Sequence, residues 1–238
     1  MMIGRRRFVP SWWSVILMLV GVAVCVSLGL WQLERAAYKE SIELKFEQRL
    51  GEPYQLFSAR QDINDIEYRK LQLRGHFDNA HNLLVDNQLH QGKAGYYVLT
   101  PLLLEDSDKI ILVNRGWAPW GESRNETASI PPPAYNDGVI GIAFFPNEPA
   151  LQLGEFELTG QWPQLIQHID IDALQPQFSG RLIPFVLWLA PEHEGYYVRD
   201  WNPVWMRPEK SQAYAVQWFA FALLALVFFI ILNLRKIE

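Results

Sequence analysis

Two long stretches without a formal charge lie near the ends of this 238-residue chain. Phe8–Leu33 contains 26 residues and Ser211–Leu234 contains 24, and the centre of each is almost wholly apolar. As α-helices they would be about 39 Å and about 36 Å long, which exceeds the roughly 30 Å hydrocarbon core of a bilayer. Two such runs in a short chain favour membrane spans over buried helices of a soluble core. We therefore predict transmembrane helices at residues 12–33 and 211–232.

The charges that flank the two spans predict their orientation. Three arginines precede the first span, and two basic residues follow the second, namely Arg5–Arg7 and Arg235–Lys236. The positive-inside rule therefore places residues 1–11 and 233–238 in the cytoplasm and residues 34–210 on the far side of the membrane. A cleaved signal peptide is the alternative for the first span, but no small-x-small cleavage site follows its apolar centre.

Composition excludes several classes of protein. Half of the residues are hydrophobic, so the chain is not disordered. The single cysteine, Cys25, excludes an internal disulfide framework and a cysteine-based metal cluster. The net charge of −5 argues against a nucleic-acid partner, which usually binds a basic patch. Residues 34–210 alone contain 16 basic and 25 acidic residues, and they are numerous enough for one domain with its own core.

The region between the spans begins as a helix and continues as strands. Apolar residues four apart, from Tyr38 to Leu50, predict that the first helix extends to Gly51, where glycine and Pro53 end it. Beyond this point the pattern becomes β-rich, with turn residues between the runs. We predict an extracytoplasmic α+β domain rich in antiparallel β-structure, as a sheet or a partial barrel. The predicted strands are 68–73, 83–85, 96–104, 110–113, 139–145, 156–159, 185–189 and 196–198, with a hairpin at 89–95 and a helix at 162–174.

No recognisable catalytic motif is present. The sequence lacks a nucleophile elbow, a zinc-protease helix, a phosphate-binding loop and a dinucleotide fingerprint. His76, His81 and His90 straddle predicted turns, so we expect solvated loop histidines rather than a metal site. His193 lies between two glutamates, which indicates a solvated acidic loop.

Aromatic residues and arginines gather near the predicted membrane boundaries. Trp31 and Arg35 close the first span, Asn114-Arg115-Gly116-Trp117 is predicted to end a strand, and Trp201 precedes the second span. Arginine can pair with an anionic ligand, and an indole can stack on a flat apolar ligand. The alternative is that these residues only hold the domain against lipid headgroups.

Four motifs in this chain resemble those of the Surfeit locus family of cytochrome c oxidase assembly proteins. Residues 28–35 (LGLWQLER), followed by Lys39, resemble the signature after the family's first span. Residues 95–102 (GYYVLTPL) and 112–119 (LVNRGWAP) are similar to two of its strand motifs. Residues 214–219 (YAVQWF) resemble the motif that opens its second span.

The resemblance implies a membrane-anchored assembly factor for cytochrome c oxidase that assists haem a insertion or stabilises the catalytic subunit. It implies binding without catalysis. The implied partners are oxidase subunits, haem a biosynthesis or other assembly proteins and the lipid bilayer. No cofactor is firmly implied, although haem a could bind transiently. The candidate contacts for haem or partners are Trp31, Gln32, Arg35, Asn114, Arg115, Gly116, Trp117, Ser211, Tyr214 and Trp218.

One position departs from the family pattern. The family commonly has a histidine, regarded as a haem ligand, three residues before the tyrosine of its second-span motif. Ser211 occupies that position here, and neither span contains a histidine. The resemblance therefore implies oxidase assembly more strongly than haem ligation by this chain.

Two other functions stay open on the sequence alone. One is a membrane-anchored extracytoplasmic enzyme or ligand-binding module of unknown substrate, although the missing catalytic constellation counts against an enzyme. A sensor would need a cytoplasmic output domain, and only four residues follow the second charge-free run. The short segment before the first span leaves no room for a mitochondrial presequence, so we expect a bacterial inner membrane.

Overall fold

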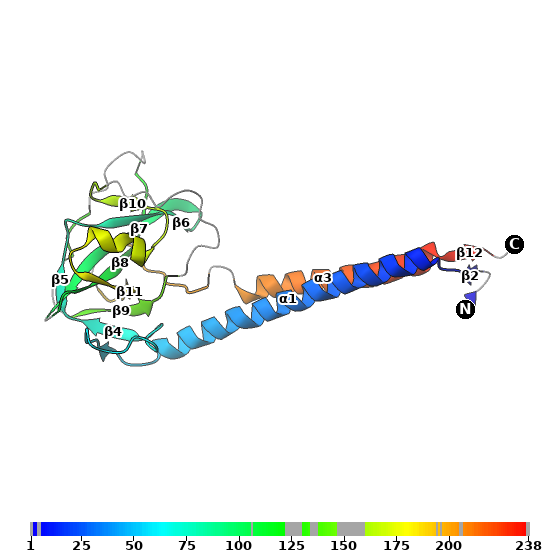
Figure 1. Cartoon of the computed structure of the whole chain (residues 1–238), viewed down its shortest axis with the longest axis horizontal. Coiled ribbons are helices and arrows are strands. Elements are labelled where there is room, and N and C mark those ends of the chain that lie inside the picture. The colour runs from blue at the N-terminus through cyan, green and yellow to red at the C-terminus, as the bar shows by residue number, and fades with distance from the viewer. Residues whose placement is uncertain are drawn as a thin grey trace. The chain divides into compact units, whose positions relative to one another are not determined.

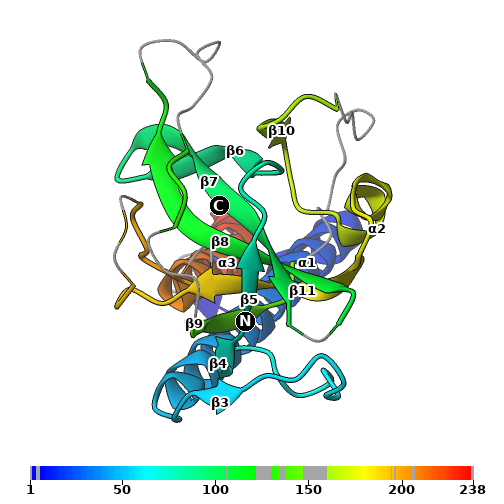
Figure 2. The same cartoon turned by 90° about the vertical axis from the view of Figure 1, so that its left-hand side faces the viewer.

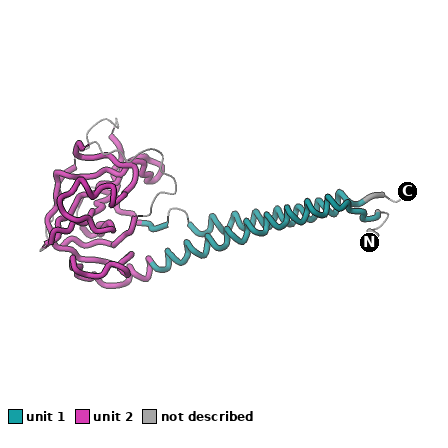
Figure 3. Tube along the Cα trace, in the orientation of Figure 1, with its two compact units in different colours: residues 1–45, 202–238 teal, residues 46–201 magenta. Residues whose placement is uncertain are grey.

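The computed structural model describes residues 2–3, 6–105, 107–121, 130–133, 138–146, 160–193, 195, 197–204 and 207–236. The chain forms two compact units, residues 1–45 with 202–238 and residues 46–201 (Figure 3). The first unit consists of the helical ends of the chain and the second of the sheet-rich middle. Their limits differ from the predicted membrane boundaries at 34 and 210, which remain predictions.

The helical unit contains two helices that are long and apolar enough to cross a membrane, α1 (Trp12–Leu50) and α3 (Pro208–Leu232) (Figure 1). The two predicted spans lie inside them. Helix α1 continues past the first span to Leu50, and Gly51 follows, which confirms the predicted extension and its end. This architecture is that of a membrane protein with a central domain between two terminal helices.

Small residues let the two helices pack closely and antiparallel. Ala36 is 3% exposed and Ala215 is fully buried. A Cβ atom on Gly29 would lie 2.6 Å from the Phe219 ring, so a larger residue there would require that ring to move. Close approach through Gly, Ala and Ser is the usual way in which membrane helices associate, because dispersion contacts replace the hydrophobic effect there. Packed positions recur at spacings of three and four along α3: Ser211, Ala215, Trp218 and Ala222.

A small three-stranded sheet joins the far ends of these helices. It contains β1 (Met2–Ile3), β2 (Arg6–Phe8) and β12 (Leu234–Lys236), all antiparallel. Where α3 ends, the Asn233 carbonyl accepts a hydrogen bond from the Val9 amide at 2.9 Å. The sheet is thus a continuation of the helix hairpin.

The described residues of the second unit form one mixed sheet of nine strands with little helix. The strand order is β10-β6-β7-β8-β11-β9-β4-β3, with β5 paired to β7. The strands are β3 (Gln55–Leu56), β4 (Lys70–Leu73), β5 (Gly75–Phe77), β6 (Leu83–His90), β7 (Lys93–Leu104), β8 (Lys109–Pro119), β9 (Val139–Phe144), β10 (Gln164–Ile166) and β11 (Arg181–Leu189), and the helices are α2 (Ile171–Leu174) and a 3₁₀ turn (Gln175–Gln177).

The sheet closes on itself as a small barrel (Figure 2). Strands β4 and β5 follow each other directly in sequence, yet β4 pairs with β9 and β5 pairs with β7. These two pairings complete the ring β7-β8-β11-β9-β4/β5, and its interior is filled by aliphatic residues and phenylalanines such as Leu71, Leu102, Ile111 and Phe185. The predicted partial barrel is confirmed, but it is not purely antiparallel, because β8 with β11, β6 with β10 and β3 with β4 are parallel.

Most predicted strands are present, and one predicted helix is wrong. The hairpin between β6 and β7 turns at Gln91 and Gly92, which both have positive φ, as a two-residue turn requires. The segment 162–174 is not one helix, because Gln164–Ile166 pairs with Leu83–Val85 as strand β10. Only Ile171–Leu174 is helical, capped by the Asp170 carboxylate. The predicted strand at 156–159 and part of that at 196–198 lie outside the described residues.

Candidate functional site

The candidate residues fall into two groups, one in each unit. Trp31, Gln32, Arg35, Ser211, Tyr214 and Trp218 belong to the helix hairpin. Asn114, Arg115, Gly116 and Trp117 belong to β8 of the barrel. Each group therefore lies within a single unit.

A lysine and a serine meet between the two helices. Ser211 is 3% exposed, and its hydroxyl oxygen accepts a hydrogen bond from the Lys39 ammonium at 3.0 Å. These residues are 172 positions apart in sequence, so only the helix pairing brings them together. Lys39 is the last residue of the signature after the first span, and Ser211 occupies the position of the family's histidine. The serine oxygen is therefore already engaged by a cation.

The aromatic residues of the hairpin lie largely outside the helix contact. Trp31 is 48% exposed and Tyr214 is 45% exposed. The Arg35 guanidinium lies 5.4 Å from the Trp31 ring centroid, within cation–π range. Trp218 contacts Phe221 edge to face and is partly buried, as is Gln32. The exposed rings are available to lipid or to a partner protein, whereas Ser211 is not.

The placement predicted for the second group is wrong. Strand β8 continues to Pro119, so Asn114–Trp117 lie within a central strand and not at its end. Asn114 is 2% exposed, Arg115 is 4% and Trp117 is 6%. Pairing on both sides of β8, with β7 and β11, holds the segment inside the domain. These side chains therefore do not form an exposed docking surface.

Arg115 belongs to a buried polar network instead. Its guanidinium donates to the Thr100 hydroxyl at 3.4 Å and to the Pro131 carbonyl at 2.8 Å. The Thr100 hydroxyl in turn donates to the Asn82 side-chain oxygen at 2.6 Å. The guanidinium carbon also lies 5.2 Å from the centroid of the Tyr197 ring. A buried arginine needs such partners, because its charge is costly to remove from water.

Residues 115–117 also form hydrogen bonds with Val198 and Arg199, which precede the second helix in the sequence. Trp117 and Val198 exchange backbone hydrogen bonds of 2.8 and 2.9 Å, and the Arg199 side chain donates to the Arg115 carbonyl at 2.9 Å. Gly116 has a φ of +125°, and a Cβ atom there would lie 2.7 Å from the Tyr197 Cβ. Glycine is required at this position for both reasons. The motif therefore acts in the structure of the domain.

Sequence reasoning missed Trp188, which lies between the two ends of the barrel unit. Its ring stacks on those of Phe144 and Trp201, with ring centroids 4.1 Å and 5.2 Å apart. The Phe46 ring meets it edge to face at a centroid distance of 6.4 Å. Phe46 and Trp201 are the first and last residues of the unit. Trp188 thereby joins the points at which the chain enters and leaves the barrel. Its apolar strand neighbours predicted only a buried strand, so no signal in the sequence indicated this role.

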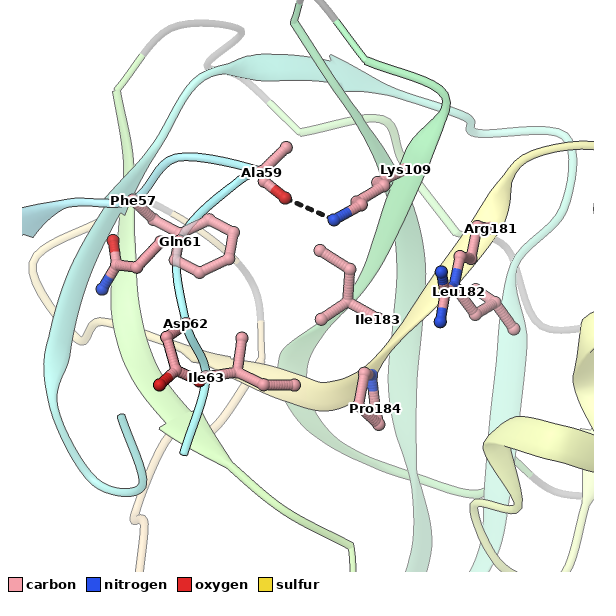
Figure 4. Close-up of a pocket in the computed structure, with 10 residues that line it drawn as sticks. All are labelled: Phe57, Ala59, Gln61, Asp62, Ile63, Lys109, Arg181, Leu182, Ile183 and Pro184. Carbon is pink, nitrogen blue, oxygen red and sulfur yellow. Dashed lines mark hydrogen bonds between the residues drawn. The ribbon is translucent and has the colours of Figure 1, made fainter. Parts of the chain in front are cut away.

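Sequence reasoning also missed a hollow beside the start of β11 (Figure 4). Its volume is about 240 Å³, and its wall is apolar at Phe57, Leu182 and Ile183. Charged residues at its edge include Arg181 and Asp62, while the Lys109 ammonium donates to the Ala59 carbonyl. The residues that line this hollow contain neither histidine nor cysteine, so the hollow is a small cavity without an evident nucleophile or histidine base.

The predicted solvated loop around His193 is wrong for that residue. Its imidazole Nε2 accepts a hydrogen bond from the Ile140 amide at 2.9 Å, and its carbonyl accepts one from Arg199. Burial, followed by the neighbouring Arg199, lowers the pKa of the imidazole below its ordinary value of 6.5. Among the described residues, no group of three His, Cys, Asp or Glu side chains is arranged to hold a metal ion.

The domain is expected to lose stability as the pH falls below about 6.5, because of His193. The folded state holds the neutral imidazole, whereas the unfolded chain takes up a proton near the ordinary pKa, so acid favours unfolding. In thermal melts between pH 7.5 and 5, His193→Gln should flatten the decline in Tm. The control His76→Gln removes an exposed histidine from the same domain. An unchanged pH dependence in His193→Gln would contradict this assignment.

The fold and the site together define a class of protein. Two helices long and apolar enough to cross a membrane flank a small mixed β-barrel in the sequence, Lys39 and Ser211 meet at the helix contact, and Asn114–Trp117 lie in a central barrel strand. A family model described as "SURF1 family" matches residues 19–223, which include the greater part of both helices and the whole barrel. The chain therefore belongs to the SURF1 family.

Named relatives match a shorter stretch of the chain. Surfeit locus protein 1 of Xenopus tropicalis is 34% identical over 128 residues, 47% of this chain and 41% of that protein. Surfeit locus protein 1 of Homo sapiens is 32% identical over 128 residues, 47% of this chain and 42% of that protein. The cytochrome oxidase assembly protein SHY1 of Saccharomyces cerevisiae is 36% identical over 93 residues, 38% of this chain and 24% of that protein. The matches thus span less than half the length of these relatives.

Proposed function

We propose that this protein is a membrane-anchored assembly factor for cytochrome c oxidase. The observation that carries the proposal is the family match over both helices and the barrel, together with the name of the yeast relative, an oxidase assembly protein. The partners are oxidase subunits and the proteins that make or deliver haem a, within the lipid bilayer. The exposed Trp31 and Tyr214 on the hairpin are the proposed contacts for such partners.

The protein acts by binding and not by catalysis. Arg115, Thr100 and Asn82 form a buried network that orders the barrel, and the hairpin presents aromatic rings rather than an acid–base pair. A second candidate function is a ligand-binding module, which the hollow between Phe57 and Ile183 favours. If the protein acts through a ligand in the hollow, a substitution there should impair oxidase assembly. If it acts only through the hairpin contacts, the same substitution should leave oxidase unchanged.

The proposed location is a bacterial inner membrane, with both termini in the cytoplasm and the barrel in the periplasm. Basic residues flank the outer ends of both helices, and residues 34–210 carry a net charge of −9. The positive-inside rule favours this orientation for two spans joined by one domain.

Deletion of the gene is expected to reduce cytochrome c oxidase activity and the spectral band of assembled haem a severalfold in membranes. The reason is that an assembly factor limits the yield of the complex and not its chemistry. The wild-type chain should restore both quantities, and so should Arg181→Ala, which alters only the edge of the hollow. Normal oxidase in the deletion strain would contradict the proposal. Failure of Arg181→Ala alone would favour the ligand-binding function.

Haem a would be a cargo of this protein, and the residues of the hairpin are poor ligands for its iron. Haem iron in proteins is usually held by histidine, methionine, cysteinate or tyrosinate. All five histidines lie between residues 76 and 193, outside both spans. The Ser211 hydroxyl is a weak ligand and is bonded to Lys39. Apolar contact with aromatic rings can retain a porphyrin, but with low affinity.

The purified protein is therefore expected to retain little haem a. Ser211→His should increase haem a retention at least tenfold and give the absorption of a histidine-ligated haem, if α3 lines the path of the cargo. Ser211→Ala is the matched control, because it removes the hydroxyl without adding a ligand. Stoichiometric haem a on the wild-type chain would contradict the prediction. No change with Ser211→His would indicate a path elsewhere.

A further inference from the structure

We propose that a face of α3 centred on Gln217 joins two copies of this protein within the membrane. Gln217 is a polar residue inside the apolar run that forms the second predicted span, and its side chain is exposed. The charge-free run 211–234 has its centre between residues 222 and 223. With this run centred in the bilayer, Gln217 lies about 8 Å from the midplane, inside a hydrocarbon core that extends about 15 Å to each side. This inference is independent of the proposed role in oxidase assembly.

Gln217 lies on the side of α3 that is opposite the contact with α1. Ser211 accepts a hydrogen bond from Lys39 of α1, and the residues on its side of α3, Ala215 and Ala222, are buried. At about 100° per residue, a second stripe of four positions falls roughly opposite these buried residues, and all four are exposed. The four positions are Ala213, Gln217, Ala220 and Leu224.

A glutamine at this depth needs a hydrogen-bond partner. The hydrocarbon core offers none, and an amide group left without hydrogen bonds there is costly. Among the described residues of the chain, none forms a hydrogen bond with the Gln217 side chain. The other members of the exposed stripe are alanine and leucine, whose side chains cannot form one. The partner of Gln217 therefore comes from outside the chain.

A second copy of the chain supplies this partner by symmetry. All copies insert in the same orientation, so a two-fold axis along the membrane normal brings residue 217 of both copies to the same depth. A glutamine amide both donates and accepts, so two glutamines satisfy each other and require no other chemistry. Ala213 and Ala220 lie one turn to either side and let the two helix backbones approach closely. The stripe contains no charge that would select an oppositely charged partner, so it is complementary to itself.

Energy transfer between donor- and acceptor-labelled copies of the full-length protein in lipid vesicles tests this inference. Transfer is measured as the ratio of protein to lipid is varied, which gives a dissociation constant. The wild-type chain should associate, and Gln217→Leu should raise the dissociation constant about tenfold, the factor expected for lost hydrogen bonds between membrane helices. Gln217→Asn retains an amide and should associate more tightly than Gln217→Leu. Gln212→Leu is the matched control, because it makes the same change at an exposed position on another side of α3 and should leave the constant unchanged.

Disulfide formation locates the contact without altering Gln217. In a Cys25→Ser background, Ala220→Cys should form a disulfide between two copies under oxidising conditions. Leu223→Cys should not, since Leu223 is also exposed but lies on another side of the helix.

Several outcomes would overturn the proposal. These are a wild-type chain that stays monomeric at every ratio, an unchanged constant for Gln217→Leu, and an equal loss for Gln212→Leu. Stronger cross-linking at position 223 than at position 220 would also do so. If the wild-type chain were monomeric and Gln217→Leu instead lost co-purifying oxidase subunits, the face would belong to a different membrane protein, and self-association would be refuted.

Discussion

Gly116→Ala is expected to destabilise the barrel domain by about 3 kcal/mol or more. At a φ of +125° a residue with a side chain is strained, and such strain costs about 1–3 kcal/mol. The added methyl group would also lie 2.7 Å from both the Tyr197 Cβ and the Val198 carbonyl oxygen, and overpacking of this kind costs a further 1–3 kcal/mol or so. Thermal or denaturant unfolding of the purified protein measures the loss.

Gly92→Ala is the matched control for this prediction. Gly92 also has a positive φ, +78°, but no atom lies within 4 Å of the position of its Cβ. Only the conformational cost applies there, about 1 kcal/mol. Equal destabilisation by the two substitutions would show that the contact with residues 197–198 adds nothing, and would contradict the role assigned to the β8 motif.

Arg115→Ala is expected to destabilise the protein by about 3 kcal/mol and to lower its abundance in the membrane together with assembled oxidase. The substitution removes a buried guanidinium from the Thr100 hydroxyl and the Pro131 carbonyl, which are left without these hydrogen bonds. Loss of one member of a buried charged network costs several kcal/mol because the remaining polar groups stay desolvated. Protein abundance by immunoblot and oxidase activity in the complemented deletion strain measure both effects.

Arg181→Ala serves as the control, since Arg181 is an exposed arginine of the same domain and its loss should change stability by no more than about 0.5 kcal/mol. If Arg115→Ala lowered oxidase while leaving abundance and Tm at the wild-type level, Arg115 would contact a partner directly. That result would restore the docking role that the sequence suggested for this residue.

The sequence predicted well those features that depend on neighbouring residues. The two charge-free runs predicted α1 and α3 because length and apolarity alone decide whether a helix can span a bilayer. The apolar period of four predicted the extension of α1 to Leu50. Local β-patterns predicted β6, β7 and β9. The helix predicted at 162–174 is wrong because β10 depends on pairing with β6, 81 positions earlier in the sequence.

The site was predicted less well, since burial is a property of the whole fold. The motif around Arg115 was visible in the sequence, but its residues were expected to end a strand and to contact haem or a partner. Strand β8 instead continues between β7 and β11, and this pairing buries Arg115 and Trp117. Trp188 and the hollow near Lys109 gave no local signal, because both are formed by segments that are distant along the chain.

By itself, then, the sequence determined that the protein has two membrane spans, a β-rich middle and the motifs of the SURF1 family, since these follow from hydrophobic patterning and residue identity. Only the tertiary structure decided that β4 and β5 close the barrel, that Lys39 donates a hydrogen bond to Ser211 and that strand β2 pairs with strand β12. Each of these depends on which distant segments pair, and the free energy of pairing comes from packing and hydrogen bonds that no local pattern contains.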